Sequence, residues 1–89
     1  MKTRELTGRA LDWAVSQIEG HERAYSTDWA HGGPIIEQER MELEHDGFVW
    51  WARIRADEDF SGHTPLVAAM RCFVASRMGD AIEVPEELQ

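Results

Sequence analysis

One stretch of this sequence constrains the fold more than any other. Residues 41–54, MELEHDGFVWWARI, place Asp46-Gly47 between two runs in which apolar and polar residues alternate. Asp-Gly is a preferred two-residue connection of a β-hairpin, and alternation is typical of a strand with one buried face. Such a turn pairs Leu43 with Trp50 and puts both on one apolar face. The sequence therefore predicts an antiparallel hairpin in this register.

This register sorts the side chains of the hairpin onto two faces. One face mixes charged residues with Trp51, and Glu42 and Arg53 are expected to pair there as diagonal neighbours. A tryptophan among charges on an exposed face indicates contact with another chain. The apolar face, which both predicted helices are expected to cover, carries Leu43, Phe48, Trp50 and Ile54.

A first helix is predicted from about residue 5 to 19, where apolar residues recur at helical spacing. Thr3 or Thr7 is expected to cap its start, and Gly20 fits the left-handed position that ends many helices. Trp13 lies off the main apolar stripe, so it is either a core residue or an interface residue.

A second helix is predicted to begin at Thr64-Pro65, since threonine is a good N-cap and proline is tolerated in the first turn. The run that follows is LVAAMRCFVASRM, and its residues 66–75 are apolar on every side except at Arg71. Arg71 is therefore expected to reach solvent, to pair with Asp28 or Glu37, or to bind an anion with its planar guanidinium.

The composition limits the classes of function. Eighty-nine residues make one domain, residues 1–89, and a hydrophobic content of 43% argues against a disordered chain. The formal net charge of −8 opposes direct binding to nucleic acid, whose phosphates must be neutralised. No apolar run is long enough to cross a membrane, so we expect a soluble intracellular protein. Residues 56–63, ADEDFSGH, are expected to form an acidic loop.

The segment YSTDWAHGGPIIE, residues 25–37, precedes the hairpin and permits two interpretations. In the structural one it is a turn, with polar side chains that accept backbone N–H groups, glycines that allow positive φ, and an extra short strand at residues 34–36. In the functional one the same backbone holds an anion and Trp29 stacks on a ring. The sequence leaves both open. The candidate ligand-binding residues are Ser26, Thr27, Asp28, Trp29, His31, Gly32, Gly33 and Arg71.

The sequence contains histidines, carboxylates and one cysteine, which are the residue types of metal and covalent sites, but not at the spacings of a known motif. The sequence has no His pair at i,i+4, no Cys pair and no twelve-residue calcium loop, so we expect no metal and no cofactor. Cys72 lies in an apolar helical run and is predicted to be a core residue. An enzyme is the less favoured class. The one enzyme hypothesis that we keep is a small hydrolase that uses His31 or Asp28.

Three blocks of the sequence resemble one family of phage proteins. ELTGRALDWAV (residues 5–15), YSTDWAHGGPIIE (25–37) and TPLVAAMRCFVASRMGD (64–80) are similar, in this order, to the small NinX-like proteins, and EVPEEL (83–88) fits as well. The resemblance covers over half of the chain. It implies a phage protein that acts in the cytoplasm of a bacterial host, and it supplies no catalytic residue, because no activity is established for the family.

These observations predict an α+β domain of two layers, in the order helix, antiparallel hairpin of two to three strands, helix. A homodimer or larger homo-oligomer is expected, because the apolar surface exceeds what one small sheet can cover. The first functional hypothesis is a non-enzymatic phage accessory protein that binds a small anionic host molecule, such as a nucleotide signal, and so counters host defence. The alternative is an acidic protein-interaction module that inhibits a host protein.

Overall fold

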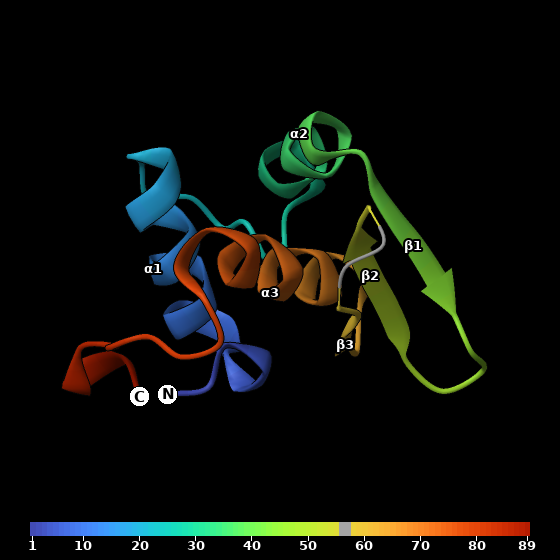
Figure 1. Ribbon diagram of the computed structural model, residues 1–89. Coiled ribbons are helices and arrows are strands. Elements are labelled where there is room, and N and C mark those ends of the chain that lie inside the picture. The colour runs from blue at the N-terminus through green and yellow to red at the C-terminus, as the bar shows by residue number, and fades with distance from the viewer. Residues whose placement is uncertain (56–57) are drawn as a thin grey trace.

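Helix α3 (Pro65–Met78) lies at the centre of the structure, with helix α1 (Gly8–Glu19) on one side and a three-stranded sheet on the other (Figure 1). It begins as predicted, since the Thr64 hydroxyl accepts the N–H of Val67 at 3.1 Å. The computed structural model describes residues 1–55 and 58–89. The elements in chain order are η1 (Thr3–Glu5), α1 (Gly8–Glu19), α2 (Trp29–Glu39), β1 (Met41–His45), β2 (Trp50–Ile54), β3 (Phe60–Gly62), α3 (Pro65–Met78) and η2 (Glu86–Leu88).

The predicted α+β class is confirmed, with α3 packed on an antiparallel sheet of order β1-β2-β3. Helix α1 packs against α3 rather than the sheet, so the expectation that both helices cover the hairpin is wrong. The reason is that α3 has buried apolar residues on opposite sides and fills the space between α1 and the sheet. Strand β3 lies within the expected acidic loop, residues 56–63, of which residues 56 and 57 lie outside the described part of the chain.

The predicted hairpin is present, but its strands are shifted by two residues from the predicted register. Leu43 lies opposite Ala52 rather than Trp50, and His45 lies opposite Trp50. The loop therefore spans residues 46–49 instead of a two-residue turn. Because the shift is even, the side chains keep their predicted faces.

The side chain of Asp46 holds this longer loop. Its Oδ1 accepts the N–H of Phe48 at 2.8 Å and of Val49 at 2.9 Å, and its own N–H donates to the Val49 oxygen at 3.2 Å. A side chain that accepts backbone N–H groups in this way competes with the tighter turn. Phe48 consequently lies in the loop and is 90% exposed, so its predicted place on the buried face is wrong.

The segment predicted as a turn with a short strand is instead helix α2, and that prediction is wrong. Asp28 starts the helix, because its Oδ1 accepts the N–H of Ala30 at 2.9 Å. Pro34 lies inside the helix, where it removes one backbone donor without ending it.

The two glycines of α2 do not form a turn, because neither has the positive φ that a turn was expected to require. Gly32 is buried, and a Cβ there would lie 2.5 Å from the Tyr25 carbonyl oxygen and 2.6 Å from Leu66 Cδ2. Gly33 precedes Pro34, and any side chain before a proline disfavours the helical conformation. Helix α2 therefore lies as close to α3 as it does only because glycine occupies position 32.

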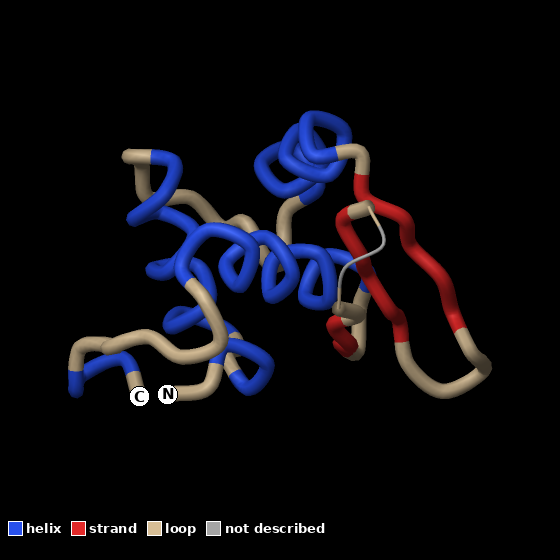
Figure 2. Tube along the Cα trace, viewed as in Figure 1, coloured by secondary structure: helices blue, strands red, loops and turns tan. Residues whose placement is uncertain are grey.

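The first helix begins later than predicted, after η1, and neither candidate threonine caps it with its side chain. Thr3 is buried instead, and its hydroxyl donates to the Gly79 oxygen at 2.6 Å. Gly20 ends α1 with φ of 85°, as predicted. The start of the chain lies against the segment that follows α3 (Figure 2), where the Met1 ammonium donates to the Ile82 oxygen at 2.8 Å.

We predict that Gly32→Ala destabilises the protein more than Gly33→Ala. Crowding against Tyr25 and Leu66 costs about 1–3 kcal/mol, of which alanine's higher helix propensity recovers only about 1 kcal/mol. At Gly33 the nearest atom to a new Cβ, leaving out the adjacent residues, is Trp29 Cε3 at an ordinary 3.6 Å. Urea unfolding of the two variants measures the difference, and equal stabilities would contradict the packing role of Gly32.

Candidate functional site

The structure brings seven of the eight predicted ligand-binding residues together in residues 26–33 and holds the eighth, Arg71, on α3. The Arg71 guanidinium donates to the Leu6 oxygen at 2.7 Å and to the Ser61 oxygen at 2.8 Å. It makes no ion pair within the described ranges, so of the three alternatives expected for Arg71 the pair with Asp28 or Glu37 is not formed. Burial lowers the pKa of this guanidinium from its ordinary value. Arg71 therefore fastens α3 to the segments on either side of it.

The N-terminus of α2 is occupied by the residue that starts it. The carboxylate of Asp28 accepts the N–H of Ala30, and its Oδ2 lies 3.8 Å from His31 Nε2. The Asp28 carbonyl accepts the N–H groups of His31 and Gly32 at 3.0 and 2.9 Å. A negative side chain already stands where an anion would bind a helix N-terminus. Trp29 is 53% exposed, so its side chain is open to a ligand.

Ser26 connects this segment to α1. Its N–H donates to Asp12 Oδ1 at 2.8 Å, while its hydroxyl is buried and finds no hydrogen-bond partner in residues 1–55 and 58–89. A nucleophilic serine needs a base within hydrogen-bonding reach. Ser26 and His31 therefore do not form a nucleophile–base pair in this structure.

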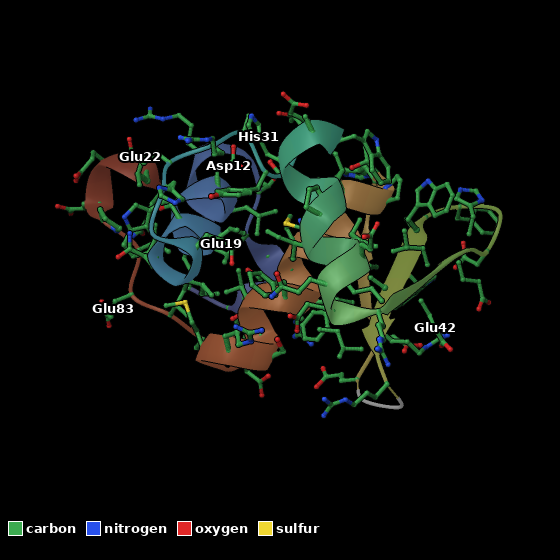
Figure 3. The ribbon with its side chains drawn as sticks, turned by 90° about the horizontal axis from the view of Figure 1, so that it is seen from above. Asp12, Glu19, Glu22, His31, Glu42 and Glu83 are labelled. Carbon is green, nitrogen blue, oxygen red and sulfur yellow. The ribbon has the colours of Figure 1, made fainter. Side chains whose placement is uncertain are left out.

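A hollow of about 290 Å³ lies beside Asp12, between α1 and the segment that follows it; we call it the α1 hollow. It combines the guanidinium groups of Arg9 and Arg23 with the indole of Trp13 and the carboxylate of Glu22. Sequence analysis missed both arginines as ligand candidates. The position of Trp13 off the apolar stripe of its helix was the one signal that pointed here. Figure 3 shows Asp12 and Glu22 far from Glu42 of the sheet.

The opposite end of the molecule carries three carboxylates around one guanidinium. Arg53 lies 2.9 Å from Glu42, 2.8 Å from Asp59 and 3.7 Å from Glu44. The predicted pairing of Glu42 with Arg53 is present, although the two residues are directly opposite rather than diagonal. Arg53 lowers the pKa of the Asp59 carboxyl from its ordinary value. Exposed ion pairs of this kind contribute little to stability. A stabilising role therefore does not account for the cluster of charges on this face.

The tip of the hairpin is a structured loop that displays an aromatic ring. Besides the backbone of the loop, Asp46 accepts the Trp51 indole N–H at 2.7 Å. These donors, with the indole contributing most, lower the pKa of Asp46 from 3.8 to about 2. Phe48 projects from this loop. We call the combined region the hairpin surface; it comprises Glu42, Glu44, Asp46, Phe48, Trp51, Arg53 and Asp59.

Other kinds of site have less support. Among the residues that the structure describes, no group of three or more His, Cys, Asp or Glu side chains could hold a metal ion. None of the described helices is long and apolar enough to cross a membrane. Cys72 is buried, as expected of a core residue.

The structure is a small α+β domain with two candidate sites, the α1 hollow and the hairpin surface. The family model described as Bacteriophage P22, NinX matches residues 21–77, which is more than half of the chain. The chain belongs to this phage protein family, as the three sequence blocks implied. The match includes the whole sheet. Of the residues that line the α1 hollow, it includes only Glu22 and Arg23. Comparison with curated proteins gives no match.

We predict that Asp46 titrates with a midpoint of about 2 instead of its ordinary 3.8. Because the pKa is lower in the folded state, the stabilisation is complete above about pH 4 and is lost as pH falls toward 2. Carbon NMR of the carboxyl measures the midpoint. In the control Trp51→Phe, which keeps a ring and removes the indole donor, the midpoint should rise. A wild-type midpoint near 3.8 would contradict this role.

Proposed function

We propose that this phage protein is a non-enzymatic interaction module that binds a basic host protein through the hairpin surface and thereby inhibits it. The observation that carries the proposal is Phe48, 90% exposed on a loop that Asp46 holds in place. Fully burying a phenylalanine is worth about 1.5–3 kcal/mol relative to leaving it exposed. A ring displayed at a fixed position is therefore suited to anchor a partner.

Charge indicates the kind of partner. On the sheet face Arg53 is surrounded by three carboxylates, so the local charge remains negative after pairing. The whole chain adds a formal net charge of −8. Fields of this sign steer basic surfaces into contact and repel acidic ones. The hairpin surface thus combines an apolar anchor with an acidic surround, as expected for binding a basic protein.

A second candidate function, binding of a small anionic host molecule such as a nucleotide signal, is supported by the α1 hollow. Arg9 and Arg23 suit a phosphate, and Trp13 offers a ring face for stacking. Asp12 and Glu22 also line the hollow, so a ligand there needs hydrogen-bond donors as well. A nucleotide has both, because its phosphate is anionic and its base edge carries N–H donors.

For the interaction module we expect the Phe48→Ser variant to lose capture of a host protein by about tenfold or more. Stability should change by less than about 0.5 kcal/mol, because the ring is exposed. The measurement is affinity capture from bacterial host lysate, quantified by mass spectrometry, with and without about 0.5 M salt to screen the carboxylates.

The matched control is Trp29→Ser, which removes another exposed ring outside the hairpin surface and should leave capture intact. A host protein captured equally by wild type and Phe48→Ser, or lost only in Trp29→Ser, would refute this assignment.

For the small-molecule candidate we expect one member of a panel of cyclic and ADP-ribose-type nucleotides to release heat in calorimetry. Replacing Arg9 or Arg23 by alanine should weaken that binding by about tenfold or more, since hydrogen bonds to a charged group are worth about 1.5–3 kcal/mol. Arg4→Ala, an exposed arginine that does not line the hollow, is the control. Absence of heat across the panel would remove this candidate.

A further inference from the structure

We propose that the free edge of β1 takes an extended segment of the partner, with alternating basic and apolar residues, as a fourth strand of the sheet. This inference rests on the proposed interaction function and names the chemistry of its partner.

The backbone of β1 is available on one side. Within the described residues β1 pairs only with β2, so its other edge has no neighbouring strand. The bond from the Asp46 N–H to the Val49 oxygen marks those two residues as a hydrogen-bonded pair. Such pairs alternate along an antiparallel ladder. The N–H and C=O groups of Met41, Leu43 and His45 therefore point away from β2, toward the free edge.

The side chains of β1 select what can bind that edge. Glu42 and Glu44 lie on the outer face, and their side chains are 64% and 65% exposed. Directly opposite residues of an added strand would lie about 4.5–5.5 Å away on the same face. Lysine or arginine at alternate positions would therefore meet the two carboxylates. Glu44 is the better placed, because it lies 3.7 Å from Arg53 while the nearer contacts are made by Glu42 and Asp59.

The intervening residues of the partner strand would meet a different surface. They would lie beside Met41 and Leu43, which are half-buried and pack against the core. Apolar side chains are favoured there, since each removes apolar area from water. Strand β1 is five residues long, Met41–His45, so a partner segment of about five residues, roughly 17 Å, matches it.

A second copy of this chain fits the edge poorly. In any antiparallel register that uses the outward groups of both β1 strands and overlaps three or more of their residues, a glutamate of one copy lies opposite a glutamate of the other. Like charges directly opposite one another are destabilising. The homo-oligomer expected from the sequence stays a prediction, and it would have to use another surface.

The first test is an NMR titration of the full-length protein with a capped heptapeptide of sequence Thr-Lys-Val-Lys-Val-Lys-Thr. The amides of Met41, Leu43 and His45 should shift and gain protection from hydrogen exchange, because these point to the free edge. A peptide with glutamate in place of lysine should not bind. Neutralising the receptor carboxylates, in E42Q/E44Q, should weaken binding by about two- to tenfold.

The second test separates strand addition from simple charge attraction. His45→Pro removes an outward N–H and leaves the bonds of β1 to β2 intact, whereas His45→Val removes the same imidazole and keeps the N–H. Binding should be lost in His45→Pro and retained in His45→Val. A peptide N-methylated at both valines should also fail to bind, and this result does not depend on any variant folding.

Three results would overturn the strand addition. They are absence of binding at about 1 mM peptide, equal binding of the N-methylated peptide, and shifts confined to residues outside β1. Self-association of E42Q/E44Q without peptide binding to wild type would also overturn it, because the glutamates would then serve only to prevent self-pairing. If Phe48-dependent capture persisted in these cases, the interaction function would stand while the strand addition fell.

Discussion

The burial of α3 on opposite sides is the constraint on which the rest of the structure depends. Phe73 and Met70 are fully buried, and every other main element packs against this helix. Arg71, in the middle of this helix, reaches backbone oxygens of Leu6 on one side and Ser61 on the other. The sheet can therefore present one face to α3 and leave the other, with its carboxylates, outside. A surface suited to recognition follows from how the core is built.

Features set by a few neighbouring residues were predictable, and features set by distant partners were not. The start of α3 at Thr64-Pro65 and the alternation of the hairpin needed only local physics. The length of the hairpin loop depended on which N–H groups the Asp46 side chain would accept, which turn statistics do not decide. Helix α2 was not predicted, because its two glycines indicated a turn. Gly32 is needed instead for the close approach of Leu66, a contact that no local pattern contains.

The candidate site shows the same division. Residues 26–33 contain the polar and aromatic residue types that ligand sites use. The carboxylate and carbonyl of Asp28, however, already accept hydrogen bonds from the first turn of α2. Arg9 and Arg23 come together beside Trp13 from separate segments, so spacing alone could not join them. The acidic outer face of the hairpin was predictable, because it follows from alternation. That Phe48 would stand in the open was not, since it depended on the longer loop.

The contact between the start of the chain and the segment that follows α3 has a practical consequence. Met1 and Lys2 lie against Ala81 and Ile82, on the side of the molecule away from the hairpin tip (Figure 1). A short peptide could therefore join the ends, and circular permutation should be tolerated with new ends opened at an exposed turn such as the one at Gly20 and His21. If the protein were attached to a surface through the joining peptide, its hairpin would point away from that surface. This orientation suits a biosensor.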